Sequence, residues 1–224
     1  MPEHAVIFDL DGTLVDTAPD LMHATNHVLG LRGRRAIGMD EVRVFVGHGA
    51  RALLTRGLAA TGGLPEGYDV EPDYTAFVEF YAANIAHGSV PFPGLIALLE
   101  RLKAAGIGMG VCTNKLETLS VLLLDALHMS HYFGAVVGPD TIGIAKPDPR
   151  PFHETVRRLG LNAPRAIMIG DSETDILTAR NAGVKVIGVP FGYTPIPVME
   201  YGPDRMIAHF DEAYDVIQDL LSTA

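Results

Sequence analysis

The chain has 224 residues, 48% of them hydrophobic, and its 17 Lys and Arg against 27 Asp and Glu give a formal net charge of −10. A chain of this size can bury a core without disulfides. An acidic chain with no Lys/Arg-rich run is poorly suited to phosphate backbones, so we expect no nucleic acid partner. With one cysteine and no apolar run of membrane-spanning length, we expect a cytoplasmic protein with no membrane partner.

Five short apolar runs, each bounded by Gly, Asp or Thr, predict the strands. They cover Ala5–Phe8, Gly108–Cys112, Ala135–Val137, 166–169 and 185–189. Between most of them, leucines recur at helical spacing. Strands that alternate with helices indicate an α/β fold with a doubly wound, mostly parallel sheet, covered by helices on both faces.

A helical insertion interrupts this pattern. The first predicted strand ends at Phe8 and the second begins at Gly108, too far apart for a simple βαβ unit. Residues 17–86 show helical patterns and no convincing strand series. We therefore expect an α/β core of residues 1–15 and 90–224 and an inserted helical subdomain of residues 16–89, with hinges at Val15-Asp16 and at 87–94.

Two carboxylates follow the first strand directly. Residues i and i+2 of an extended chain project to the same side, so Asp9 and Asp11 face one point. At about 4 Å, two such charges repel by roughly 4 kcal/mol at an effective dielectric constant near 20. The pair could instead be a turn at Asp11-Gly12. Its place after the first strand of an α/β sheet favours a ligand site, because ligands bind beyond the carboxyl ends of such strands.

Polar side chains also follow the second strand. Thr113 and Asn114 offer a hydroxyl and an amide at a helix start, where free backbone N–H groups suit an oxyanion. The alternative is that one of them caps the next helix, with Glu117 completing a capping box. These residues alone do not separate the two interpretations.

The remaining two strand ends supply a lysine and two more carboxylates. Pro147 keeps Lys146 out of any helix, although most lysines are solvated surface groups. Asp171 ends the fourth strand, and Asp175, one helical turn later, can face the same side. Asp175 could instead pair with Ser172 as a helix cap.

Together these residues predict a metal site at one sheet edge. Carboxylates clustered without thiolates or a His pair form an all-oxygen site, which favours Mg²⁺ over Zn²⁺. The chain has two His pairs at helical spacing, His23/His27 and His128/His131. Neither has a third ligand, so we interpret them as surface or core residues.

The motif order Asp-x-Asp-Gly-Thr, Thr-Asn, Lys-Pro-Asp-Pro and Gly-Asp-Ser-x-x-Asp resembles the haloacid dehalogenase-like phosphohydrolase superfamily over essentially the whole chain. Further segments resemble its phosphoglycolate phosphatase subgroup, which has a helical cap after the first motif. They are residues 16–21, 45–49, 136–138 and 191–193.

The resemblance implies roles for the residues that handle phosphate. Asp9 would be the nucleophile, and Asp11 the general acid and base. Thr113 and Asn114 would bind the oxygens of the transferred phosphoryl group. This chemistry agrees with the residues, because phosphoryl transfer needs an in-line nucleophile and a cradle for spreading negative charge.

It also implies a magnesium cofactor. Asp9, Asp171 and the backbone carbonyl of Asp11 would hold Mg²⁺, and Lys146 would neutralise the nucleophile and the phosphate. Asp175 would orient either a metal-bound water or Lys146.

The implied activity is Mg²⁺-dependent phosphomonoester hydrolysis through an aspartyl-phosphate, with 2-phosphoglycolate as substrate. The family's dehalogenases lack the second aspartate of the first motif, which is present here as Asp11. Its sugar-phosphate mutases carry a histidine at the position of Leu21. Both differences favour hydrolysis. Two alternatives stay open: a phosphatase for sugar phosphates, nucleotides or pyrophosphate, and a phosphate-accepting receiver module. The partner would be a small phosphorylated metabolite. The sequence does not distinguish a monomer from a dimer.

The cap is expected to choose the substrate. A two-carbon acid phosphate needs a cation for its carboxylate, and His48, Arg51 or Arg56 could supply one. Gly47 and Gly49 would let the backbone approach closely. The alternative is that both arginines lie on exposed faces of a cap helix.

Overall fold

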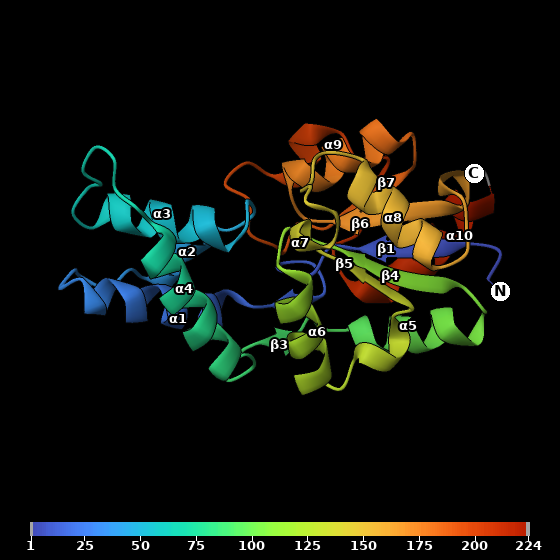
Figure 1. Ribbon diagram of the computed structural model, residues 1–224. Helices are drawn as coiled ribbons and strands as arrows, with labels where there is room; N and C mark the ends of the chain where they lie inside the picture. The colour runs from blue at the N-terminus through green and yellow to red at the C-terminus, as the bar shows by residue number, and fades with distance from the viewer. Residues whose placement is uncertain (1, 223–224) are drawn as a thin grey trace.

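The computed structural model describes residues 2–222 and has two parts, an α/β core and a unit of helices beside it (Figure 1). The core sheet is parallel, with strand order β5-β4-β1-β6-β7-β8. Its strands are β1 (Ala5–Phe8), β4 (Gly108–Cys112), β5 (Ala135–Val137), β6 (Ala166–Gly170), β7 (Val186–Gly188) and β8 (Arg205–Met206). The five predicted strands are confirmed. Strand β8 was not predicted, because two residues are too few to form an apolar run.

Strand β1 lies at the centre of the sheet, and its neighbours end level with it. Phe8 pairs with Val111 of β4 on one side and with Ile169 of β6 on the other. The chain segments that leave these three strands therefore start side by side, at one edge of the sheet. This register brings residues from distant parts of the sequence together.

Helices cover both faces of the sheet, as the doubly wound fold requires (Figure 1). Val6 and Phe8 of β1 pack into one apolar cluster, and Ala5 and Ile7 into another. The first cluster includes residues of α5 (Leu95–Ala104), α6 (Glu117–Ala126) and α10 (Ala213–Ser222). The second includes residues of α8 (Arg150–Arg158) and α9 (Glu173–Ala182). The predicted fold class is confirmed.

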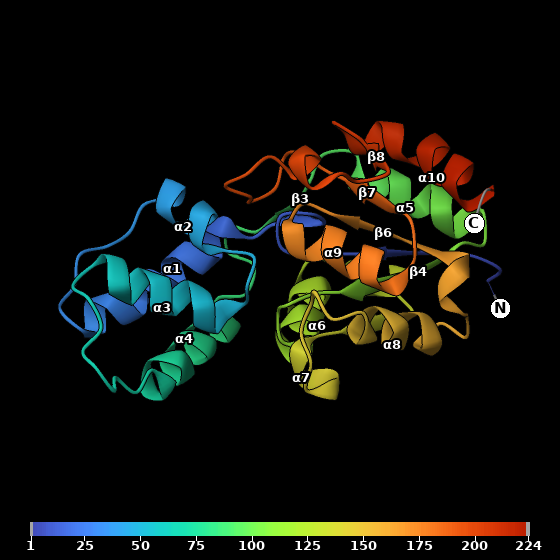
Figure 2. The same cartoon turned by 90° about the horizontal axis from the view of Figure 1, so that it is seen from above.

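The insertion is a separate helical unit, as predicted (Figure 2). Its helices are α1 (Ala18–Leu31), α2 (Met39–Phe45), α3 (Ala50–Ala60) and α4 (Glu71–Ala83). They enclose an apolar cluster of their own. Two short antiparallel strands, β2 (Val15–Asp16) and β3 (Val90–Pro91), connect the unit to the core. That residues 16–89 act as a specificity cap on a catalytic core stays a prediction.

Buried polar contacts fix both connections. The carboxylate of Asp20, at the start of α1, accepts hydrogen bonds from the backbone N–H groups of Gly88 and Ser89 and from the Ser89 hydroxyl, at 2.6 to 3.1 Å. On the other connection, the Tyr193 hydroxyl donates to Asp16 at 2.5 Å. The helical unit is thus held to the core by side-chain contacts as well as by the chain itself.

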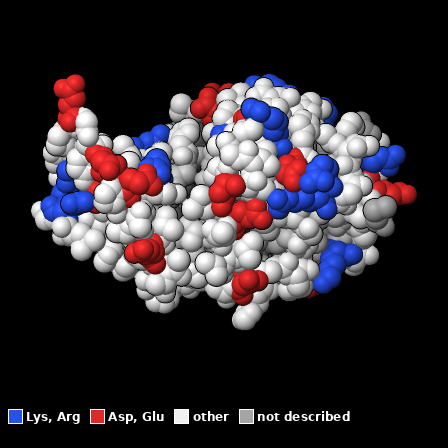
Figure 3. Space-filling model, viewed as in Figure 1, with Lys and Arg blue, Asp and Glu red and all other residues white. Residues whose placement is uncertain are grey.

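Charged side chains of both signs are interspersed over the core and the helical unit on the face shown in Figure 3. Within the described residues, none of the helices has the length and apolar character needed to cross a membrane.

Candidate active site

The first acidic motif forms a tight turn beyond the end of β1. The Asp9 backbone N–H donates to the Ile169 carbonyl at 2.9 Å, which continues the pairing of β1 with β6. Gly12 has φ +87°, and a Cβ there would lie 2.7 Å from Asp171 Oδ2. Glycine is therefore required on both conformational and steric grounds. The turn sets Asp9 beside Asp171.

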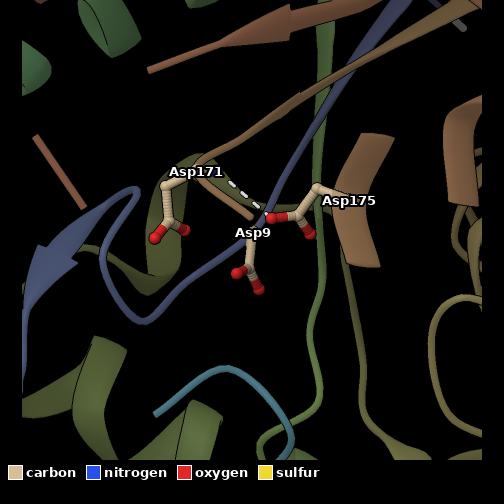
Figure 4. Close-up of side chains that lie close together, drawn as sticks. All are labelled: Asp9, Asp171 and Asp175. Carbon is tan, nitrogen blue, oxygen red and sulfur yellow. Dashed lines mark hydrogen bonds between the residues drawn. The ribbon is translucent and has the colours of Figure 1, made fainter. Parts of the chain in front are cut away.

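Three buried carboxylates meet at this edge of the sheet. Asp9, Asp171 and Asp175 each have an oxygen within 4.8 Å of the others (Figure 4). The two oxygens of Asp171 are oriented by the Thr13 hydroxyl at 2.9 Å and the Tyr193 backbone N–H at 2.7 Å. The predicted convergence of these strand ends is confirmed.

The acidic cluster is electrostatically suited to a cation. Burial, reinforced by the charge of Asp175 and opposed by Lys146, raises the pKa of Asp9 to about 7. Burial and the charges of Asp175 and Asp9 raise the pKa of Asp171 well above its ordinary value. Asp9 Oδ1 is buried, and the ammonium of Lys146 lies 2.8 Å from it. A hard divalent cation fits this all-oxygen donor set and relieves the repulsion.

Lys146 is the counter-ion of the cluster. Its Nζ lies 2.6 Å from Asp175 Oδ1 and 2.8 Å from Asp9 Oδ1, and its side chain is buried. Burial alone would lower the pKa of Lys146, but the charges of Asp175 and Asp9 outweigh it and raise that pKa. The lysine therefore stays charged against the predicted nucleophile.

Asp175 serves as a helix cap and as a lysine partner at once. Its Oδ2 accepts hydrogen bonds from the Ser172 hydroxyl at 2.7 Å and from the Ser172 backbone N–H at 3.0 Å. Its Oδ1 faces Lys146. Of the two roles that the resemblance implies for Asp175, this direct contact favours orientation of Lys146.

The Thr113-Asn114 segment is not a helix cap. Helix α6 begins at Glu117, whose backbone N–H donates to Asp140 at 2.7 Å. The Asn114 amide instead accepts from the Lys146 backbone N–H at 2.9 Å and donates to the Lys146 carbonyl at 3.2 Å. Asn114 thus positions the segment that carries Lys146. Phosphate contact by Thr113 and Asn114 stays a prediction.

Lys115 is a functional candidate that the sequence analysis missed. Its side chain is buried, and Nζ lies 3.1 Å from Asp11 Oδ1 and 2.8 Å from the Tyr81 hydroxyl of α4. The motif at the end of β4 includes this lysine. Nothing in the sequence separates it from an ordinary exposed lysine, because its contact with Tyr81 depends on how the inserted unit packs against the core.

A cavity of about 230 Å³ lies between the core and the helical unit. Its core-side polar wall contains Asp9, Asp11, Asn114, Lys115 and Lys146, and its other wall contains His48 and Arg51.

The three cap candidates differ in their placement. His48 and Arg51 line the cavity, and Arg51 is paired with Glu71 at 2.6 Å. Arg56 is not among the residues of the cavity wall. Its guanidinium donates to the Phe45 carbonyl at 2.8 Å, at the end of α2. Arg56 therefore makes a structural contact between α3 and the end of α2 within the helical unit.

Comparisons with known proteins agree with this geometry. A profile of the haloacid dehalogenase-like hydrolase family matches residues 6–189. The chain is 48% identical to a phosphoglycolate phosphatase of Caulobacter vibrioides, over 92% of this chain and 86% of the relative. It is 43% identical to a phosphoglycolate phosphatase of Mesorhizobium japonicum, over 94% of this chain and 93% of the relative.

Solved structures are similar over nearly the whole chain. A predicted phosphoglycolate phosphatase from Haemophilus somnus superposes with a TM-score of 0.89 at 30% identity, covering 96% of this chain and 97% of the other. CbbY from Rhodobacter sphaeroides, in complex with phosphate, superposes with a TM-score of 0.80 at 27% identity, covering 96% and 97%. The chain belongs to the haloacid dehalogenase-like hydrolase family.

Proposed function

We propose that the protein is a phosphomonoester hydrolase whose substrate is 2-phosphoglycolate. The observation that carries this proposal is the buried pairing of Asp9 with Lys146 at the cavity wall, with Asp11 beside it. A carboxylate held against a fixed cation at the wall of a cavity is suited to attack a phosphorus atom. The names of the relatives from Caulobacter and Mesorhizobium support phosphoglycolate as the substrate.

Magnesium is the proposed cofactor. The Asp9 and Asp171 carboxylates, with the Asp11 backbone carbonyl, would hold it. The buried carboxylate oxygens of Asp9, Asp171 and Asp175, which lie within 4.8 Å of one another, support this assignment. When bound, Mg²⁺ supplies positive charge for the phosphate and for the charge that develops in the transition state.

The side chains divide the reaction into two steps. Asp9 attacks phosphorus, forming a P–O bond as the bond to the leaving oxygen breaks, and Asp11 gives that oxygen its proton. Asp11 then takes a proton from water as the water attacks the phosphorus of the aspartyl-phosphate, which releases phosphate and regenerates Asp9. Lys146 stays against Asp9 throughout, fixed by Asp175.

The cavity supports a small substrate. Its volume of about 230 Å³ and its partly apolar wall suit a compact metabolite. The acidic composition and single cysteine support a cytoplasmic enzyme.

The test is phosphate release from 2-phosphoglycolate, sugar phosphates, nucleotides and pyrophosphate, each measured with and without Mg²⁺. We expect 2-phosphoglycolate to have the highest kcat/KM and activity to need the metal. A higher kcat/KM for another phosphate would replace the substrate and leave the mechanism in place.

The variant Asp9→Asn tests the mechanism itself. It should release no phosphate while its circular dichroism spectrum stays that of the wild type. Substantial turnover by this variant would contradict Asp9 as nucleophile. A stable phosphorylated wild-type protein without turnover would favour the receiver alternative.

A further inference from the structure

Lys115 occupies an unusual position for a lysine. Its side chain is 4% exposed and lies where the core meets the helical unit, in contact with Asp11 of the core and Tyr81 of α4. Nζ also lies 4.3 Å from the centre of the Tyr81 ring. The cavity wall therefore contains a buried lysine, whose Nζ lies 3.1 Å from Asp11 Oδ1 and 2.8 Å from the Tyr81 hydroxyl.

The position of Lys115 matches the leaving-group side of the site. Asp9 marks where phosphorus must lie, and Asp11 marks the leaving oxygen, because it gives that oxygen its proton. Lys115 Nζ is 3.1 Å from Asp11 Oδ1. A group two bonds beyond the leaving oxygen would therefore reach the neighbourhood of Lys115.

The other cations of the cavity wall are less available. Lys146 is held between two carboxylates. Arg51 forms an ion pair with Glu71, and its side chain is 48% exposed. Lys115, by contrast, has one carboxylate partner and a phenol, in a wall that also contains Leu21 and Phe77. A charge pair is stronger in such surroundings than at an exposed site.

We propose that Lys115, together with the Tyr81 hydroxyl, binds the carboxylate of the substrate and so selects acid phosphates over neutral ones. This inference rests on the proposed function. It replaces the cap candidates His48, Arg51 and Arg56, one of which we expected to bind this carboxylate, with a lysine of the core. Because Tyr81 belongs to α4, the bound carboxylate also contacts both parts of the molecule at once.

The experiment compares two substrates of equal chain length, 2-phosphoglycolate and ethyl phosphate, which lacks the carboxylate. In the wild type, kcat/KM should be much higher for 2-phosphoglycolate. In Lys115→Met, the ratio of the two kcat/KM values should fall by about 30- to 100-fold, as expected for a lost hydrogen bond between charged groups. Lys115→Arg keeps the charge and should recover part of the ratio.

The matched control is Lys103→Met, the same change at an exposed lysine of α5 away from the cavity. It should leave both kcat/KM values at the wild-type level. If Lys115→Met does not fold, as judged by circular dichroism, Tyr81→Phe removes only the second donor and should lower the same ratio by a smaller factor.

The outcomes distinguish a failure of the role assigned to Lys115 from a failure of the proposed substrate. An equal fall of both kcat/KM values in Lys115→Met would show that Lys115 only supports Asp11, and would overturn this inference alone. An unchanged ratio in a folded Tyr81→Phe would overturn the part assigned to Tyr81. A wild type that hydrolyses ethyl phosphate as well as 2-phosphoglycolate would overturn the inference and the proposed substrate together.

Discussion

Lys146 and Asp175 form a fully buried ion pair, with Nζ 2.6 Å from Oδ1 and side chains that are 1% and 0% exposed. The lysine comes from the loop before α8 and the carboxylate from the first turn of α9, so the pair joins two separate segments beneath Asp9. Such a pair contributes little net stability while intact, but removing one partner leaves a buried charge uncompensated. Its geometric effect is to fix the ammonium against the predicted nucleophile.

Replacing Asp175 should therefore damage both stability and activity. Asp175→Ala is expected to lower the free energy of unfolding by about 3–5 kcal/mol, the range for breaking a buried ion pair. It should also lower kcat by about 100-fold, because Lys146 loses its position. Urea unfolding and steady-state kinetics measure the two effects.

The matched control is the Lys185–Asp204 pair, which has a similar length of 2.8 Å but is partly exposed. Lys185→Ala breaks this pair but leaves the hydrogen bond from the Val186 backbone N–H to Asp204 in place. It should cost much less stability, since exposed pairs contribute about 0–1 kcal/mol, and should keep full activity. Equal losses of stability at the two positions would contradict the importance of burial.

The sequence predicts the core of this protein well and its substrate pocket poorly. Strands such as β1 and β6 are local apolar runs, and a parallel sheet brings their carboxyl ends together, so Asp9 and Asp171 could be placed side by side from the sequence. Contacts across the cavity depend on how the helical unit packs, which no local pattern encodes. For this reason the sequence indicates Arg51 as a candidate for binding the substrate carboxylate, although Arg51 pairs with Glu71, and does not indicate Lys115.

The raised pKa of Asp9 predicts a pH dependence of stability. The folded protein holds this proton up to a pKa of about 7, whereas the unfolded chain loses it near the ordinary value of 3.8. The folded state therefore binds more protons between these values, and stability falls as the pH rises through that window. Without metal, the free energy of unfolding should be lower at about pH 8 than at about pH 5.

Two comparisons isolate Asp9 from the rest of the acidic chain. Asp9→Asn, which cannot ionise, should lose less stability than the wild type between the same two pH values. Mg²⁺ should restore stability to the wild type at the higher pH, because it binds the folded, ionised cluster. Identical pH profiles for the wild type and Asp9→Asn would contradict this explanation.

Because Gly192 has no side chain, the Asp171 carboxylate can pack directly against its backbone. A Cβ at this position would lie 2.1 Å from Asp171 Oδ2. Gly192→Ala should therefore displace the carboxylate and raise the Mg²⁺ concentration for half-maximal activity by about 10-fold or more, as is common when the support of a metal ligand is disturbed. The control is Gly30→Ala in α1, where a Cβ would meet nothing within 4 Å and Mg²⁺ dependence should not change.

Tyr193 connects the acidic cluster with the first connection to the helical unit. Its backbone N–H donates to Asp171 at 2.7 Å, while its hydroxyl donates to Asp16 at 2.5 Å and accepts from the Ala18 N–H at 3.0 Å. Tyr193→Phe removes only the hydroxyl contacts, so Mg²⁺ dependence should stay normal. The helical unit should be held less firmly over the cavity, and kcat/KM should fall by about 10-fold. Tyr214→Phe in α10 is the control and should change neither quantity. A raised Mg²⁺ requirement in Tyr193→Phe would instead place the effect of the hydroxyl at the metal site.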